Sequence, residues 1–376
     1  MEALETGATL TIDLGALAAN WRLLRDRSSA AECAAVVKAD AYGIGIEPAV
    51  GSLWRAGCRT FFVAHLSEAA RVRAVAPEAV IYVLNGLLPG TAPRCREFGL
   101  RPVLGSMPEI REWAEFCGGT KLPAALHVDT GMNRLGLTPA EATALAGDPV
   151  VSAFEPALLM SHLAASEEPS QPINDRQVAT FLAVAAEYPG VPASLANSSG
   201  VFLADSFPPM RGLALARPGY ALYGGNPTPD RPNPMQPVVR LDARIIQVRE
   251  IEAGAKAGYN ETWTAARPSR LATLSIGYAD GYPRSASGTD AAIRADLPVG
   301  AALVAGRLCP FVGRVSMDLI ILDVTDLPER EVSRGDPAVL IGGPLDINEV
   351  GRRAGTIGYE ILTNLGRRYT RHYVQD

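Results

Sequence analysis

The sequence predicts an α/β chain of two domains, an N-terminal (β/α)8 barrel of the TIM type and a C-terminal, mostly β domain. Three observations support this fold class. Apolar runs of strand length alternate with amphipathic stretches over the first two-thirds of the chain, a proline-rich segment follows, and the hydrophobic period beyond it is that of strands. A length of 376 residues also suits a barrel with a smaller module better than one ordinary core.

Eight short apolar runs are the candidate barrel strands. They follow one another at intervals of roughly 20 to 35 residues, about one βα unit each. Strands that alternate with helices in this way predict a parallel sheet closed into a barrel. The runs lie at 35–37, 61–63, 81–84, 102–104, 125–128, 158–160, 194–196 and 213–215.

Amphipathic stretches lie between the apolar runs, as a βα repeat requires. In one of them, Val178, Phe181 and Ala185 keep the spacing of a single helix face. Helices are therefore expected at 68–75, 108–116 and 175–186, with a further helix at 17–27 before the first strand.

The proline-rich segment 226–237 predicts a domain linker, because five prolines in twelve residues cannot hold a helix or a central strand. We therefore assign residues 1–235 to the barrel and 236–376 to the β domain, with residues 1–10 as candidates for the β domain. Beyond the linker, strands are expected at 241–245, 271–276, 301–304, 319–324 and 338–341, and helices at 347–353 and 359–365.

The composition is that of a globular protein and excludes several classes of partner. The net charge of −5 offers no basic surface for nucleic acid or anionic lipid. The N-terminus lacks the features of a signal peptide, and no apolar run is long enough to span a bilayer. The five cysteines include no Cys-x-x-Cys and the four histidines no His-x-x-x-His. We expect a cytoplasmic protein with no metal site and with no nucleic-acid or membrane partner.

Polar residues follow several predicted strands, at the end where barrels build active sites. Lys38 follows the first strand, and such a lysine is either solvated or an amine whose pKa is lowered by burial and which suits a Schiff base. Ser198 and Gly219 follow the seventh and eighth strands, where barrels commonly bind phosphate through hydroxyls and backbone N–H groups. A reactive lysine opposite a phosphate cradle indicates pyridoxal 5′-phosphate.

Seven motifs, in order along nearly the whole chain, resemble those of the alanine racemases, a family of fold-type III pyridoxal-phosphate enzymes. One such motif is weak evidence, whereas seven in the family's order are specific. The resemblance implies a homodimer that interconverts L-alanine and D-alanine and supplies D-alanine for peptidoglycan. The motifs are Val-Lys-Ala-Asp-Ala-Tyr-Gly-Ile-Gly at 37–45 and the segments 127–136, 217–224, 258–263, 277–284, 313–318 and 356–360.

The resemblance also implies which residues bind the cofactor. Lys38 forms the internal aldimine and serves as one catalytic base. Arg217 faces the pyridine nitrogen and, because a guanidinium keeps its protons, leaves that nitrogen unprotonated. His162 packs against the ring. The other implied cofactor-binding residues, most of them at the phosphate, are Tyr42, Asn197, Ser198, Gly219, Tyr220 and Tyr359.

A second base is implied by the chemistry and identified by the resemblance. Racemisation removes the Cα proton from one face and returns a proton to the other, which two bases on opposite faces, Lys38 and Tyr259, can do. Tyr259 and Met317 come from the second subunit, and Arg134 reaches the substrate carboxylate and the cofactor's phenolic oxygen. A tyrosine with a pKa of about 10 also needs neighbours that favour its phenolate, and His162 and Arg217 are the candidates.

Two positions depart from the family pattern. Ile44 stands where many relatives have histidine. Isoleucine at this position can keep a role in the backbone turn, but it cannot keep a polar contact made by the histidine side chain. His127 stands where many relatives have a carbamylated lysine that fixes the equivalent of Arg134. Because a buried guanidinium without a partner is costly, we expect a bound anion, or else neutral acceptors, to hold Arg134.

Rival functions share parts of this pattern. A broader-specificity or serine racemase is the nearest. A fold-related amino-acid decarboxylase would need an acidic partner for the pyridine nitrogen, where this chain offers Arg217. A non-enzymatic pyridoxal-phosphate carrier resembles the barrel alone, and a cofactor-free phosphosugar barrel lacks the lysine-bound cofactor.

Overall fold

The computed structural model describes residues 5–28, 30, 32–204, 207, 210 and 212–375. Its contacts divide the chain into two compact units, one of Leu17–Gln236 and the other of Met1–Ala16 with Pro237–Asp376. The proline-rich residues 226–237 contain no helix or strand and lead across the boundary between these units. None of the described helices is long and apolar enough to cross a membrane.

Seven parallel strands form the curled sheet of the first unit, Leu17–Gln236. Neighbouring strands pair in chain order, which is the arrangement of a βα repeat. Most of their residues are buried, as expected of a sheet with helices outside and side chains filling the interior. The strands are β3 (Ala35–Val36), β4 (Thr60–Val63), β5 (Val80–Val83), β6 (Arg101–Leu104), β7 (Pro123–His127), β8 (Glu155–Met160) and β9 (Ala193–Ser194).

An eighth strand, β10 (Leu215–Ala216), closes this sheet into a barrel. It pairs in parallel with β2 (Glu32–Cys33), which directly precedes β3. On its other side, the N–H of Arg217 donates to the carbonyl of Ala196, just beyond β9, at 2.8 Å. The predicted (β/α)8 barrel is therefore confirmed, although its last strand lies slightly later in the chain than the run at 213–215.

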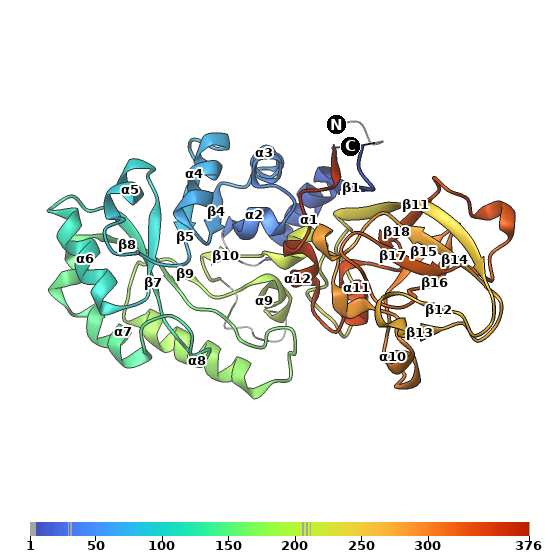
Figure 1. Ribbon diagram of the computed structural model, residues 1–376. Helices are drawn as coiled ribbons and strands as arrows, with labels where there is room; N and C mark the ends of the chain where they lie inside the picture. The colour runs from blue at the N-terminus through green and yellow to red at the C-terminus, as the bar shows by residue number, and fades with distance from the viewer. Residues whose placement is uncertain are drawn as a thin grey trace. The chain divides into compact units, whose positions relative to one another are not determined.

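Helices α3 to α8 surround the curled sheet (Figure 1). The helices expected at 17–27, 68–75, 108–116 and 175–186 all form, and each is slightly longer than predicted. The helices are α1 (Leu14–Arg27), α2 (Lys38–Tyr42), α3 (Ile46–Ala56), α4 (Leu66–Val75), α5 (Ala92–Glu97), α6 (Met107–Cys117), α7 (Pro139–Ala146), α8 (Pro172–Ala186) and α9 (Ser198–Leu203).

The second unit is mostly β, as predicted. Six strands pair in the order β16-β15-β18-β11-β1-β19, and β14 joins the sheet through β11 and carries β17. A separate hairpin pairs β12 (Lys256–Ala257) with β13 (Trp263–Thr264). The sheet strands are β1 (Ala8–Asp13), β11 (Val239–Ile251), β14 (Ser269–Leu274), β15 (Ala301–Val304), β16 (Arg307–Pro310), β17 (Ile320–Asp323), β18 (Pro337–Ile341) and β19 (Thr370–Val374), and the helices are α10 (Asp290–Arg294), α11 (Ile347–Arg353) and α12 (Gly358–Thr363).

Strand β11 is long because it takes part in two sets of pairings. Its first half pairs with β1 and β18 and its second half with β14, and the β14 pairing contains a register shift between Ile245 and Gln247. Leu241 and Ala243 are buried and Arg244 is exposed, so the alternation read from the sequence is confirmed.

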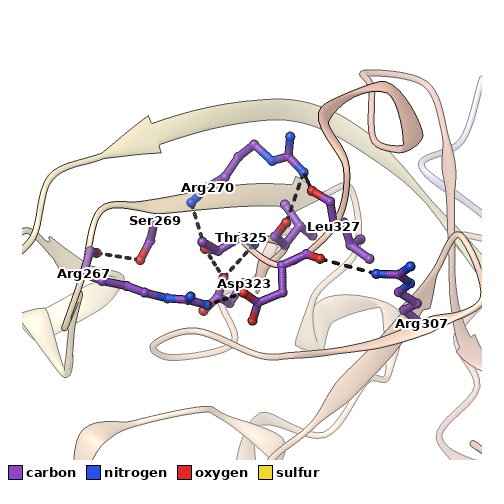
Figure 2. Close-up of polar contacts among 9 residues, drawn as sticks. Arg267, Ser269, Arg270, Arg307, Asp323, Thr325 and Leu327 are labelled. Atoms are coloured by element: carbon purple, nitrogen blue, oxygen red, sulfur yellow. Dashed lines mark hydrogen bonds and ion pairs between the residues drawn. The ribbon is translucent and has the colours of Figure 1, made fainter.

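A polar cluster fixes the turn that follows β17 (Figure 2). The carboxylate of Asp323 accepts from the backbone N–H of Thr325 at 2.9 Å, and the Thr325 hydroxyl accepts from the N–H of Arg270 at 3.0 Å. The Arg270 guanidinium donates to the carbonyls of Val324 and Leu327. Because these acceptors belong to the turn itself, the cluster stabilises the β14–β17 pair, and none of the predicted site residues belongs to it.

Candidate active site

Lys38 lies where β3 gives way to a left-handed turn. The N–H of Val37 still donates to the carbonyl of Phe62 on β4, at 2.8 Å. Each of the four residues 39–42 then has φ between 53° and 55°, a conformation that costs L-residues about 1–2 kcal/mol each. Strain of this kind persists only where neighbouring contacts hold it, and it clusters at functional sites.

The Lys38 side chain is partly buried and has both cationic and anionic neighbours. Burial, and then the charge of Arg134, lower the pKa of its amine, whereas Glu68 acts in the opposite direction. A lowered pKa raises the fraction of neutral amine, which is the form that attacks a carbonyl carbon. Lys38 therefore has the environment that Schiff-base chemistry requires.

Three residues predicted to hold the phosphate lie in contact with one another. The Ser198 hydroxyl, at the first residue of α9, accepts from the N–H groups of Gly219 and Ala221 at 3.0 and 3.1 Å. A β-carbon at Gly219 would lie 2.4 Å from the phenolic oxygen of Tyr42, so glycine permits this close approach. Tyr42 stacks on Tyr223 with ring centroids 4.5 Å apart, and burial raises its pKa, which keeps it a neutral phenol able to donate.

Asn197 and Tyr220 flank these three residues. Asn197 is the N-cap of α9, and its Oδ1 accepts from the N–H of Gly200 at 2.8 Å and from the Ser166 hydroxyl at 2.9 Å. Tyr220 begins the 3-10 turn Tyr220–Tyr223 and is buried. The side-chain oxygen of Asn197 is thus used by its own helix, so Asn197 shapes the loop that carries Ser198.

Arg217 is buried just after β10 and is held by neutral oxygens. Its Nη1 donates to the Ser194 hydroxyl, and its Nη2 donates to the Ser161 carbonyl at 2.5 Å. Burial lowers its pKa to about 9, which leaves it protonated at neutral pH. A protonated guanidinium can only donate, so Arg217 can offer an N–H to a ring nitrogen but cannot protonate it.

Gln177 is a buried residue that sequence reasoning missed. Its Nε2 donates to the carbonyl of His162 at 2.9 Å and to the hydroxyl of Thr130 at 3.2 Å, and its Oε1 accepts from the N–H of Ala164 at 2.8 Å. Thr130 in turn shares a hydrogen bond of 2.8 Å with the Ser161 hydroxyl. Gln177 therefore fixes the chain at the ends of β7 and β8. The sequence feature that could have revealed Gln177 is a polar amide side chain on the apolar face of the predicted helix 175–186.

His162 and His127 lie among the cations of the site. Burial and then the charge of Arg217 lower the pKa of His162 to about 3 and that of His127 to about 4. Both imidazoles are therefore neutral at neutral pH. Among the two groups considered for favouring a Tyr259 phenolate, only Arg217 brings a charge, whereas His162 can bring a hydrogen bond.

Arg134 is exposed in the single chain, and the anion expected beside it stays a prediction. It lies on a loop after β7, where Asp129 Oδ1 accepts from the N–H groups of Gly131 and Met132 at 2.8 and 2.9 Å. Asp129 thus shapes the loop that carries Arg134.

Three predicted site residues belong to the second unit. Tyr259 begins a 3-10 turn that ends at Glu261, and its side chain is 69% exposed. Met317 is 53% exposed, and its carbonyl accepts from the N–H of Ala279 at 3.0 Å. Tyr359 is the second residue of α12 and is partly buried. The exposure of Tyr259 and Met317 leaves both side chains available to another surface.

The residues of the first unit fit pyridoxal 5′-phosphate. The Ser198, Gly219 and Tyr42 group offers the hydroxyl and close backbone approach that a phosphate needs, Arg217 offers an N–H to the ring, and Lys38 offers an amine of lowered pKa. Within the described residues, no group of three or more histidine, cysteine, aspartate or glutamate side chains could hold a metal ion.

Comparison with known proteins shows two family models that together match most of the chain. "Alanine racemase, N-terminal domain" matches residues 12–227, and "Alanine racemase, C-terminal domain" matches residues 238–373. The alanine racemase of Methylobacterium nodulans is 63% identical over 371 residues, covering 98% of this chain and 96% of its own.

Two solved structures share the fold over nearly their whole length. The alanine racemase from Bartonella henselae with covalently bound pyridoxal phosphate is 41% identical, with a TM-score of 0.90, over 98% of this chain and 99% of its own. The biosynthetic alanine racemase from Pseudomonas aeruginosa is 35% identical, with a TM-score of 0.87, over the same shares.

Proposed function

The chain belongs to the alanine racemase family, and from this premise we propose that it interconverts L-alanine and D-alanine with pyridoxal 5′-phosphate attached to Lys38. The observation that carries the proposal is the group formed by Ser198, Gly219 and Tyr42 in the same barrel as the lysine of lowered pKa. Pyridoxal phosphate, when bound, withdraws electrons from the substrate Cα and so acidifies its proton.

Each barrel residue then has a defined task. Ser198, Gly219, Tyr42 and Tyr220 hold the phosphate, with Asn197 shaping the loop that carries Ser198. Arg217 donates to the ring nitrogen without protonating it, so the ring draws fewer electrons than a protonated ring would. We infer that this favours rapid return of a proton over transfer of the amino group. His162, neutral at neutral pH, packs against the ring, and Arg134 binds the substrate carboxylate.

Two bases move the proton. In our proposal Lys38 takes or returns the Cα proton on one face and Tyr259 does so on the other. Tyr359 completes the phosphate site, as the family resemblance implies.

We further propose that the active enzyme is a homodimer in which Tyr259 and Met317 serve the partner's barrel. The support is that both side chains are more than half exposed in the single chain. Exposure leaves both side chains available to a second chain, and the family resemblance supplies the reason to place them there.

The rival functions are less well supported. The relatives reported above are named alanine racemases. A decarboxylase is expected to place an acidic residue at the pyridine nitrogen, whereas this chain offers Arg217, whose own hydrogen-bond acceptors are neutral. Two relatives from Agrobacterium fabrum, one named biosynthetic and one catabolic, are 47% and 46% identical to this chain. Because they are almost equally similar, the proposed role in supplying D-alanine for peptidoglycan in the cytoplasm rests on the family resemblance alone.

Incubation with L-alanine, L-serine and L-lysine in separate reactions tests the proposal, with optical rotation followed over time. Rotation that decays to zero with L-alanine, and far more slowly with the other two, is the expected result. Decay with L-serine at an equal rate would make the enzyme a broader-specificity racemase. Release of carbon dioxide from L-lysine without racemisation would make it a decarboxylase.

A further inference from the structure

Helix α4 contacts the left-handed turn that follows Lys38. Glu68, in the first turn of α4, accepts from the backbone N–H of Ala39 through Oε1 at 2.6 Å. Its other oxygen, Oε2, accepts from the N–H groups of Ala64 and His65 at 2.8 and 3.2 Å. One carboxylate thus joins the residue after Lys38 to the end of the neighbouring strand β4.

Capping of α4 accounts for only one of the two oxygens. A glutamate at the third helical position commonly reaches back to the N-cap N–H, and the bond from His65 to Oε2 is of this type. The bond from Ala39 to Oε1 comes from another part of the chain and contributes nothing to the cap.

A second contact from the same helix holds the same turn. Arg71, one helical turn after Glu68, pairs with Asp40 at 2.6 Å and with Glu47 on α3 at 2.5 Å. Asp40 also accepts from the N–H of Ile46 at 3.1 Å. Helix α4 therefore grips both Ala39 and Asp40, the first two residues with positive φ.

These contacts fix the backbone of Lys38 on both sides. The N–H of Val37 is tied to the carbonyl of Phe62 at 2.8 Å. The N–H of Ala39 belongs to the peptide unit that begins at the Lys38 carbonyl carbon, so its bond to Glu68 sets ψ of Lys38. Together they determine the direction in which the Lys38 side chain leaves the barrel rim.

The charge of Glu68 also acts on the lysine. Arg134, from the loop after β7, lowers the pKa of Lys38, and Glu68 raises it, with burial the largest influence. His162, from the end of β8, is coupled to Lys38 as well and is neutral at neutral pH. Glu68 is the anion in this set.

We propose that Glu68 is a positioning residue for Lys38, which holds the strained turn and supplies the negative charge that opposes Arg134. This rests on the proposed function only in taking Lys38 as the residue that binds the cofactor. The role is distinct from catalysis, because Glu68 acts through the peptide after Lys38.

The test measures covalent attachment rather than racemisation. Protein freed of cofactor is mixed with pyridoxal 5′-phosphate over a range of pH, reduced with borohydride at intervals, and analysed by mass spectrometry of the Lys38 peptide. Glu68→Gln leaves one acceptor oxygen for three N–H groups and removes the charge. Glu47→Gln is the matched control, because it likewise removes one carboxylate charge, here the one paired with Arg71 of α4, but leaves the bonds of Ala39, Ala64 and His65 intact.

We expect Glu68→Gln to slow attachment about tenfold or more, as the loss of a hydrogen bond to a charged group implies. We also expect the pH profile of its attachment rate to shift to lower pH, because removal of the negative charge lowers the pKa of Lys38 further. Glu47→Gln should stay within about twofold of the parent, since it loses an exposed ion pair. A folded Glu68→Gln protein with the rate and pH profile of the parent would overturn the proposal.

Glu68→Asp covers the case in which Glu68→Gln fails to fold. It keeps the charge and an acceptor for the start of α4, but its side chain is too short to reach Ala39 as well. Slowed attachment with an unmoved pH profile is expected, and attachment at the parent's rate would overturn the proposal. Failure of the parent itself to label Lys38 would instead refute the proposed function.

Discussion

The buried guanidinium of Arg217 donates a hydrogen bond to the hydroxyl of Ser194, a residue that carries no charge. The Ser194 hydroxyl in turn donates to the carbonyl of Leu215 at 2.6 Å, so its proton is committed there and its lone pairs face Arg217. Neutral acceptors satisfy the N–H groups of a guanidinium without neutralising it. In the proposed site, Arg217 thus keeps its full positive charge for the ring nitrogen of the cofactor.

Ser194→Ala should weaken cofactor binding and lower the free energy of unfolding by about 1–3 kcal/mol, because a buried donor of Arg217 loses its acceptor. Titration with pyridoxal 5′-phosphate and urea unfolding measure the two effects. Ser269→Ala is the matched control, since that hydroxyl donates to the carbonyl of Arg267 at 2.8 Å, a bond that involves none of the predicted site residues (Figure 2). Equal cofactor affinity in the two variants would contradict this role of Ser194.

Lys38→Ala should abolish covalent attachment of the cofactor and racemisation in both directions. The reason is that no other side chain in the proposal supplies the amine. Absorbance in the visible range and its bleaching by borohydride report attachment, and optical rotation reports activity. A Lys38→Ala protein that still racemises alanine at a comparable rate would refute the assignment.

Tyr259→Phe should keep the coloured, attached cofactor but lose most activity, because phenylalanine preserves the ring and removes only the proton-transfer group. Exchange of the Cα proton with deuterated solvent should survive mainly on the face served by Lys38, which by family resemblance handles D-alanine. Equal loss of exchange from both enantiomers, with the cofactor still bound, would argue against two bases.

A mixture of the Lys38→Ala and Tyr259→Phe chains should recover activity, since each site of the proposed homodimer takes one base from each chain. About one functional site per heterodimer is expected from the two-fold symmetry of such an interface. Activity after verified subunit exchange is the measurement. No recovery would place both bases on one chain.

The fold was largely predictable because the strands of a βα barrel are buried and apolar. The strand β1 was missed although Leu10 and Ile12 alternate with threonines, because an N-terminal segment has no neighbour in sequence that reveals its partners β11 and β19. The lowered pKa of Lys38 was predictable from its place after the first strand. Glu68, Gln177 and Ser194 were not, because their partners lie far away in the chain and only the folded backbone brings them together.

Stability should fall as the pH drops below about 6.5, the ordinary pKa of an unfolded histidine. The pKa of His127 is about 4 and that of His162 about 3 in the folded chain. Between these values and 6.5 the unfolded chain binds more protons, so each histidine removes stability at about 1.4 kcal/mol per pH unit. Urea unfolding from pH 7 to pH 4.5 measures the slope.

His162→Gln should flatten this dependence of stability on pH. Substitution of the exposed His372 serves as the control. An unchanged slope in His162→Gln would contradict the lowered pKa of His162.

The last prediction concerns the pair formed by His127 and Arg134. Histidine cannot form the carbamate that the lysine of many relatives forms, and its lowered pKa makes it neutral at neutral pH, so it provides no counter-charge. Arg134 itself is exposed in the single chain. Removal of dissolved carbon dioxide should therefore leave the racemase activity unchanged, as measured in buffer purged with nitrogen and then supplemented with bicarbonate.

His127→Lys is the informative comparison, because burial at this position favours the neutral amine that reacts with carbon dioxide. The activity of this variant should respond to bicarbonate. Activity of the parent that is lost on purging and restored only by bicarbonate would show that another group of this chain is carbamylated.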